Sequence, residues 1–206
     1  MSLEARGVSF RYPRRGRRMV LEGVDLRLEP GERLGLSAPS GRGKTTLCKL
    51  LAGYERPTRG EIRLDGNPLP GGGAPCPVQM LWQHPESAVD PLLPLRESLY
   101  EAGPVEERLL EALHIRPDWL RRYPQELSGG ELQRFCIARA LGPRTRYLLC
   151  DEITAMLDLI TQAQIWQFLL EEAQRRELGL LIVSHNSALL ERVCGRIATL
   201  PPAGTP

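Results

Sequence analysis

The sequence predicts an α/β fold with a mostly parallel sheet, to which an antiparallel β subdomain and a small helical subdomain are attached. Short apolar segments that read as strands alternate with helical segments along most of the chain. Such alternation is typical of a parallel sheet whose strands are connected by helices. The strand segment 178–183 is also continuously apolar, and 146–151 has an apolar centre over 147–150, as expected for strands that are buried on both faces.

The composition is that of a folded protein. The chain has 206 residues, of which 42% are hydrophobic and 25% charged, and these values exclude a predominantly disordered chain. The net charge of +2 predicts no overall attraction to nucleic acid, although it leaves room for a local basic patch. Segment 1–12 lacks the apolar core of a signal peptide, and no stretch reaches the roughly 18 apolar residues of a membrane helix. We therefore expect a soluble, intracellular chain that can still lie against a membrane protein.

The cysteines and lysines narrow the chemistry further. The chain has five cysteines, an odd number without a C-x-x-C pair, which argues against a disulfide framework. We expect them to be small buried residues. Only two of the 27 basic residues are lysines, Lys44 and Lys49. A lysine inside a motif is therefore unlikely to be there by chance.

The first 30 residues are expected to form part of the antiparallel β subdomain. Segments 3–12 and 20–28 show partial apolar alternation, which predicts two strands. The arginine-rich stretch 14–18 between them reads as a hairpin tip exposed to solvent.

A strand–loop–helix unit follows. Residues 33–37 read as a short buried strand, 38–43 as a loop that contains glycine, and 44–52 as a helix that ends at Gly53. Another strand is expected at 60–65.

The middle of the chain changes character. Segment 68–77 is rich in Pro and Gly and is expected to be a loop, and 78–82 reads as a strand. Prolines then separate short helical stretches such as 105–113. We interpret residues 84–135, approximately, as a helical subdomain inserted into a single domain that spans 1–206.

The last third returns to alternating elements. A helix is expected over 129–141 and a buried strand over 146–151. An amphipathic helix over 161–177 and an apolar strand over 178–183 follow. Residues 201–206 are expected to be a frayed tail.

Residues 38–45 carry the pattern of a phosphate-binding P-loop. They lie between a predicted strand and a predicted helix, where backbone N–H groups can surround phosphate oxygens and the helix start adds a positive dipole end. We expect Lys44 to reach the β- and γ-phosphates and Thr45 to bind Mg²⁺. Ala38 stands where the pattern has glycine, and it fits if its φ stays negative. The residues predicted to bind the nucleotide are Ala38, Pro39, Ser40, Gly41, Arg42, Gly43, Lys44, Thr45 and Thr46.

Two acids, Asp151 and Glu152, end an apolar strand. This position is the carboxyl edge of the sheet, where α/β proteins bind ligands. Because adjacent strand residues point in different directions, one acid can face the metal and the other the attacking water. We assign Asp151 to Mg²⁺ and Glu152 to water activation as a general base. Without the P-loop, acids that serve only solubility would be the simpler interpretation.

Residues 127–134 read LSGGELQR, which closely resembles the signature motif of ABC-transporter ATPases. The order of the P-loop, Gln83, this motif, the LLCDE segment and Ser184-His185 is similar to that family over nearly the whole chain. The resemblance implies one ABC ATPase domain with a P-loop NTPase-type sheet, which binds ATP and Mg²⁺ and hydrolyses ATP.

The resemblance implies four further roles. Tyr12 matches the aromatic residue that stacks on adenine. Gln83 matches the glutamine that touches Mg²⁺ or the attacking water and signals to the transmembrane partner. Asp158 matches the D-loop aspartate, and His185 matches the switch histidine that contacts the γ-phosphate.

Ser128, Gly129 and Gly130 precede a predicted helix and so form a second anion-binding helix start. In the family this start completes the nucleotide site of a facing subunit, so that two ATP molecules are held in a head-to-tail dimer. The closed dimer forms around ATP, and hydrolysis releases it.

Three positions depart from the family pattern. Glu131 replaces the usual Gln of the signature motif, Ile153 replaces a Pro, and Ala155 replaces the D-loop Ser. These changes bear on the coupling between the two sites rather than on ATP binding.

Segments 81–91 and 151–163 resemble the ATPases of dipeptide, oligopeptide and nickel importers. This implies an ATP-hydrolysing importer subunit that powers the uptake of nickel, metal-chelate or peptide-type substrates. Its partners would be two transmembrane permeases, a sister ATPase in a heterodimer rather than a homodimer, and indirectly an extracytoplasmic solute-binding protein, with no nucleic acid. The chain would lie peripherally on the cytoplasmic face of the cell (inner) membrane. The alternatives are a non-transport ABC ATPase in DNA repair or on the ribosome, and an exporter ATPase.

Overall fold

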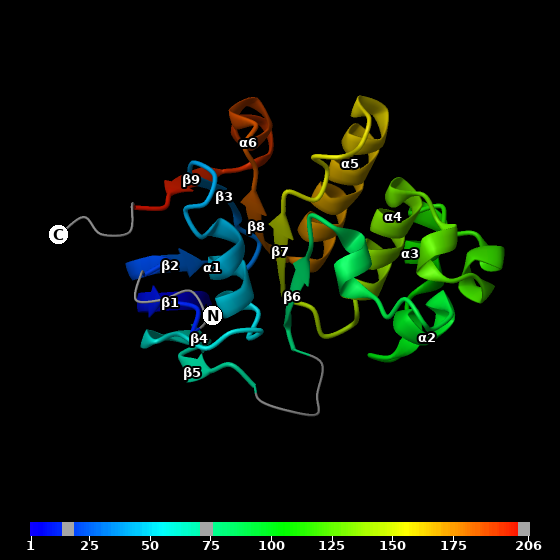
Figure 1. Ribbon diagram of the computed structural model, residues 1–206. Helices are drawn as coiled ribbons and strands as arrows, with labels where there is room; N and C mark the ends of the chain where they lie inside the picture. Colours follow the sequence, from blue (N-terminus) through cyan, green and yellow to red (C-terminus); the bar gives the residue numbers. More distant parts are fainter. Residues whose placement is uncertain (14–18, 71–75, 202–206) are drawn as a thin grey trace.

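The computed structural model of the 206-residue chain describes residues 1–13, 19–70 and 76–201. These residues form two sheets, one of four strands in the order β2-β1-β4-β5 and one of five in the order β6-β7-β8-β3-β9 (Figure 1). The predicted hairpin tip at 14–18 and all but the first residue of the predicted tail at 201–206 lie outside the described residues.

The four-stranded sheet is antiparallel, as the sequence predicts for its first two strands. β1 (Leu3–Phe10) pairs with β2 (Leu21–Leu28) on one side and with β4 (Arg59–Leu64) on the other. The prediction that all of 68–77 is a loop is wrong at its first residue, because Asn67–Pro68 form the short strand β5 against β4. Asp65 allows this pairing because it takes a positive φ of 54° in the connecting turn.

The five-stranded sheet is parallel throughout. This confirms the predicted fold class. Its strands are β3 (Arg33–Ser37), β6 (Val78–Leu81), β7 (Tyr147–Asp151), β8 (Gly179–Val183) and β9 (Arg196–Thr199). Neither β9 nor the helix α6 (Ser187–Val193) before it is predicted from the sequence.

The continuous apolar sequence of the central strands follows from their having a hydrophobic core on each face. Tyr147 and Leu149 of β7 enter one core, whereas Leu148 and Cys150 enter the other. β8 divides its side chains between the two cores in the same alternating way. A strand buried on both faces needs no polar side chains.

Helices cover the two faces. α1 (Lys44–Leu51) contributes to the core that joins the parallel sheet to the antiparallel sheet, and α5 (Leu159–Arg176) to the opposite core. Ile165, Leu169 and Ala173 are buried on the apolar face of α5 that the sequence predicts, whereas Phe168, predicted on the same face, is only partly buried.

Short helices occupy the segment between β6 and β7 and lie beyond the β6 edge of the sheet in Figure 1. They are η1 (Pro85–Ala88), α2 (Leu95–Tyr100), α3 (Glu107–Ala112), η2 (Pro117–Arg121), η3 (Pro124–Glu126) and α4 (Gly129–Ala140). Each of the three 3₁₀ helices has a proline at its start, where a missing N–H costs nothing. The division into a 1–206 domain with an inserted helical subdomain stays a prediction.

The expectation that the cysteines are buried is confirmed for three of them and is wrong for Cys76 and Cys194, which are partly exposed. All five are free, and Cys48, Cys136 and Cys150 are buried. Burial raises the pKa of Cys136 to about 12, so this thiol stays protonated at neutral pH. Across the described part of the chain, no helix combines the length and apolarity that crossing a membrane requires.

Candidate functional site

The phosphate loop connects the end of β3 to the start of α1. Gly41 and Gly43 both have positive φ, of 74° and 88°, a conformation that glycine adopts without strain. Gly43 also leaves no room for a side chain, because a Cβ would lie 2.8 Å from Leu21 Cδ2 and 3.1 Å from the Val20 carbonyl oxygen. The glycines therefore serve both the curvature and the packing of the loop.

Lys44 places a positive charge within this loop. Its side chain is buried, and Nζ donates hydrogen bonds to the carbonyl oxygens of Ala38 at 2.7 Å and Pro39 at 3.3 Å. Ala38 is not among the residues with positive φ, so the alanine fits where the pattern has glycine. The ammonium and the amide groups at the start of α1 together favour an anionic ligand.

Asp151 and Glu152 diverge, but not by strand alternation. β7 ends at Asp151, and Glu152 turns away with a left-handed φ of 52°. Its N–H donates to the carbonyl oxygen of Val183 on β8 at 3.1 Å, which holds the turn. The strand ends at Asp151, as the predicted range 146–151 has it. The expected alternation of adjacent strand residues is therefore not what separates the two acids, although their side chains do face different surroundings.

Asp151 is 2% exposed at the carboxyl end of the sheet. Burial raises the pKa of this carboxyl group, and the neighbouring Glu152 raises it further, whereas a hydrogen bond from Thr45 and the charge of Lys44 lower it. An ionised carboxylate in this environment gains from a cation beside it. Thr45 and Asp151 are both oxygen donors, which is the ligand type that Mg²⁺ takes.

Four predicted site residues, Ser40, Lys44, Glu152 and His185, meet at this edge. Glu152 Oε1 lies 2.9 Å from His185 Nε2, and Lys44 Nζ lies 3.3 Å from the same nitrogen. The Ser40 hydroxyl is 3.5 Å from it. Because Nε2 can donate to the carboxylate or accept from the ammonium, but not both, the histidine can exchange partners when a charged ligand arrives.

Gln83 and Tyr12 flank this cluster. Gln83 comes two residues after β6, which pairs in parallel with β7 so that Leu81 lies opposite Cys150. It is therefore placed at the same carboxyl edge as Asp151. The Tyr12 hydroxyl lies 3.2 Å from Thr46 Oγ1 in the first turn of α1.

The remaining predicted residues form a second, separate surface. Ser128, at the start of α4, lines a cavity of about 590 Å³ together with Gly130 and Asp158. Asp158 begins α5, and its Oδ1 accepts hydrogen bonds from the N–H groups of Ile160 and Thr161, both at 3.0 Å. No residue of segment 38–46 lines this cavity, so one chain presents two surfaces rather than one closed site.

One supporting contact was missed by the sequence analysis. Trp166 on α5 donates from Nε1 to Thr154 Oγ1 at 3.1 Å, and this contact ties the loop after Glu152 to the helix. A tryptophan on the apolar face of an amphipathic helix reads as core, so only the hydrogen-bond need of its buried N–H could have signalled the role.

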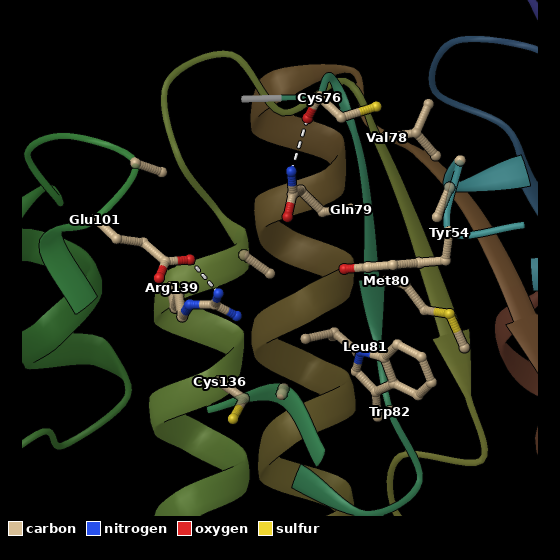
Figure 2. Close-up of a pocket in the computed structure, with 15 residues that line it drawn as sticks. Tyr54, Cys76, Val78, Gln79, Met80, Leu81, Trp82, Glu101, Cys136 and Arg139 are labelled. Atoms are coloured by element: carbon tan, nitrogen blue, oxygen red, sulfur yellow. Dashed lines mark hydrogen bonds and ion pairs between the residues drawn. The ribbon is translucent and has the colours of Figure 1, made fainter. Parts of the chain in front are cut away.

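A cleft of about 450 Å³ lies between β6 and the short helices (Figure 2). Tyr54 and Trp82 lie on the β6 side, with Lys49 Nζ placed 5.2 Å from the centre of the Trp82 ring. Arg139 of α4 and Glu101 form an ion pair on the opposite side. Because Trp82 precedes Gln83, this cleft is connected by the chain itself to the carboxyl edge.

A family model described as ABC transporter matches residues 21–155. The chain belongs to the ABC transporter family. Its predicted enzyme class, an ATPase that binds ATP, and its predicted fold are thereby confirmed.

Relatives and solved structures extend this match. A Rhodospirillum rubrum protein named nickel import ATP-binding protein NikE is 38% identical over 88% of this chain and 72% of its own length. The probable D,D-dipeptide transport ATP-binding protein DdpF of Escherichia coli K12 is 34% identical over 88% of this chain and 60% of its own length. The structure of the ATP-binding cassette MJ0796 as a post-hydrolysis dimer with ADP and Pi is similar with a TM-score of 0.80 at 24% identity, covering 96% of this chain and 94% of the other.

Proposed function

We propose that this ABC-family ATPase is the energy-supplying subunit of an importer that takes up nickel, metal-chelate or peptide-type substrates through a pair of transmembrane permeases. The relatives named as nickel and dipeptide import proteins support this substrate range. The contact of His185 with both Glu152 and Lys44 carries the hydrolytic part of the proposal.

The residues at the sheet edge fit a magnesium nucleotide. Thr45 and Asp151 would hold Mg²⁺ with the phosphates, and Gln83 would reach it or the attacking water. A magnesium ion bound through few protein oxygens and the substrate's own phosphates is the usual arrangement at such sites. When bound, the ion supplies charge neutralisation between the β- and γ-phosphates.

The chain's own residues would perform the remaining steps. Lys44 would exchange the carbonyl oxygens that it now contacts for phosphate oxygens, which form stronger charge-assisted hydrogen bonds. Glu152 would orient the attacking water and accept its proton. His185 would pass from the carboxylate to the γ-phosphate, and Tyr12 would lie against the adenine.

We assign the second surface to contact with a partner ATPase subunit. A cavity away from the phosphate loop is lined by Ser128, Gly130 and Asp158, and Gly129 is the first residue of α4. These four residues would complete the nucleotide site of a facing ATPase. We favour a sister ATPase, hence a heterodimer, as that partner. A permease would contact the cleft beside Trp82, on the cytoplasmic face of the membrane, and an extracytoplasmic solute-binding protein would deliver the substrate.

Uptake measurements test this function. Cells that lack the chain are compared with cells that carry the wild type or Lys44→Ala, using radiolabelled nickel and a radiolabelled dipeptide. We expect the wild type alone to restore the uptake of one of these substrates. Equal uptake of both substrates in all three strains would contradict an importer of this class.

A further inference from the structure

Glu131 forms a capping box with Ser128 at the start of helix α4. Its Oε2 accepts hydrogen bonds from the N–H and the hydroxyl of Ser128, each at 2.8 Å, and its own N–H donates to Ser128 Oγ at 3.3 Å. A serine hydroxyl has a single hydrogen. Ser128 therefore has no O–H to donate elsewhere while this contact lasts, and its N–H is held by the same oxygen.

The Glu131 carboxylate carries a negative charge at this point. Hydrogen bonds from the backbone and side chain of Ser128 lower its pKa, so it is ionised at neutral pH. Arg134 lines the same cavity, but its guanidinium donates to Gln164 Oε1 at 2.9 Å. It is therefore engaged with a neighbour on α5.

Other arginines only partly offset this charge. Arg116 and Arg122 are close enough to lower the pKa of Glu131. Both nevertheless pair with Asp118, at 2.8 Å and 2.6 Å. Within segments 1–13, 19–70 and 76–201, Glu131 forms no ion pair of 4.0 Å or less.

A second carboxylate that lines this cavity, Asp158, also caps the start of a helix. Asp158 accepts hydrogen bonds from two N–H groups at the start of α5 and, at 2.6 Å, from the Thr161 hydroxyl. An anion that enters the cavity thus meets two acidic groups, each bound to the start of its own helix. Of the two, only Glu131 binds the hydroxyl and N–H of Ser128.

We propose that Glu131 is an internal competitor for the start of α4: its carboxylate must leave Ser128 before a triphosphate can bind there. The residue thereby determines how readily ATP closes the dimer. This inference rests on the proposed function, in which Ser128 completes the nucleotide site of a facing subunit. Glu131 acts through Ser128 and is a positioning residue.

Replacing Glu131 with glutamine separates the effect of its negative charge from that of its hydrogen bonds to Ser128. In Glu131→Gln the amide oxygen can still accept from Ser128, so the helix start keeps its hydrogen-bond acceptor while the negative charge is removed. Glu126 offers a matched control, because its Oε2 caps η3 in the same way by accepting from Tyr123 N at 2.6 Å. Glu126 does not line the cavity.

The test measures self-association of the full chain, since every copy carries both surfaces. Hydrolysis is arrested with Glu152→Gln in all samples, and the dimer dissociation constant is measured by analytical ultracentrifugation with ATP and Mg²⁺. We expect Glu131→Gln to tighten the ATP-dependent dimer by about tenfold at low salt, because two like charges no longer face each other. This gain shrinks at about 1 M salt, where charges are screened within a few ångströms.

The control and the opposing outcome are defined in the same experiment. Glu126→Gln leaves the dissociation constant unchanged, and Glu131→Gln keeps the melting temperature of the single chain. Equal dissociation constants with and without Glu131→Gln overturn the competitor role. ATP binding to the single chain is measured separately by equilibrium dialysis: failure there refutes the proposed function itself, whereas intact binding with equal dissociation constants refutes only the role of Glu131.

Discussion

Replacing Glu152 with glutamine separates hydrolysis from nucleotide binding. The Glu152 carboxylate lies 2.9 Å from His185 Nε2 and comes from the turn after β7, not from the phosphate loop. The amide of Glu152→Gln keeps the size of the side chain and an oxygen that can accept from the histidine, but it cannot take a proton from water.

The magnitude follows from the loss of a general base. Positioned proton transfer contributes about 10²- to 10⁴-fold to a rate, so we expect the turnover of Glu152→Gln to fall by that factor. The contacts of Lys44 with the loop do not involve Glu152. We therefore expect the dissociation constant for ATP to stay within about threefold of the wild type, less than the tenfold that 1.4 kcal/mol would produce.

The assay combines phosphate release under saturating ATP with equilibrium dialysis of labelled ATP. Glu191→Gln on α6 is a matched control, because this glutamate is exposed and the same change there should alter neither quantity. Turnover of Glu152→Gln within twofold of the wild type would refute the assignment of Glu152 as the base.

Three further changes test other parts of the structure. Lys44→Ala removes the buried ammonium and should weaken ATP binding by about 10- to 100-fold, the loss of a charged hydrogen bond, as measured by dialysis; unchanged affinity would count against Lys44 as a ligand. Gly43→Ala places a Cβ 2.8 Å from Leu21 Cδ2 at a φ of 88°, and a thermal melt should show a loss of at least about 1–2 kcal/mol, whereas an unchanged melt would show that the loop can relax. Burial raises the pKa of Glu172, but hydrogen bonds from Arg175 and Arg108 outweigh this effect, so the pKa is lowered in the folded chain. The ionised Glu172 carboxylate therefore stabilises the folded state fully at pH values above its ordinary pKa of 4.5. This stabilisation is lost as the pH falls through the lower pKa of the folded chain. Because the side chains of Arg108 and Arg175 are 46% and 48% exposed, solvent screens these ion pairs, and Glu172→Ala should lower the free energy of unfolding by about 1 kcal/mol at pH 7 and by less in acid. An equal loss at pH 7 and in acid would contradict this linkage.

Most of the fold could be predicted because the apolar pattern is unambiguous where strands are buried on both faces. Residues 147–150 show this best, since their side chains enter two cores in alternation. The elements that the sequence analysis missed are short. α6 (Ser187–Val193) buries only two of its residues and β9 (Arg196–Thr199) none, so neither carries a periodic apolar signal.

The candidate site was predicted as a set of residues but not as a geometry. The phosphate loop is local in sequence, and its glycines indicate its conformation directly. The left-handed φ of Glu152 has no such signal, because the residue is not glycine and the turn depends on a hydrogen bond to Val183 on another strand. The contact between Lys44 and His185 likewise requires the parallel pairing of β3 with β8, which no local pattern encodes.

The Glu131 cap shows a different limit. The spacing of Ser128 and Glu131 is that of a capping box, yet from the sequence Glu131 stands out only as a replacement for glutamine. Its effect on Ser128 depends on side-chain geometry, because the same carboxylate oxygen accepts from both the N–H and the hydroxyl.

The central claim is that a magnesium nucleotide lies between two copies of this kind of subunit, held by the phosphate loop of one and the signature segment of the other. The most direct test is an experimental structure of the assembled protein, with hydrolysis arrested by Glu152→Gln and ATP and Mg²⁺ present. We expect the triphosphate beside Lys44 of one subunit and the Ser128 position of the facing subunit. Triphosphate bound elsewhere, or an assembly whose contact surface leaves both positions open to solvent, would contradict the account.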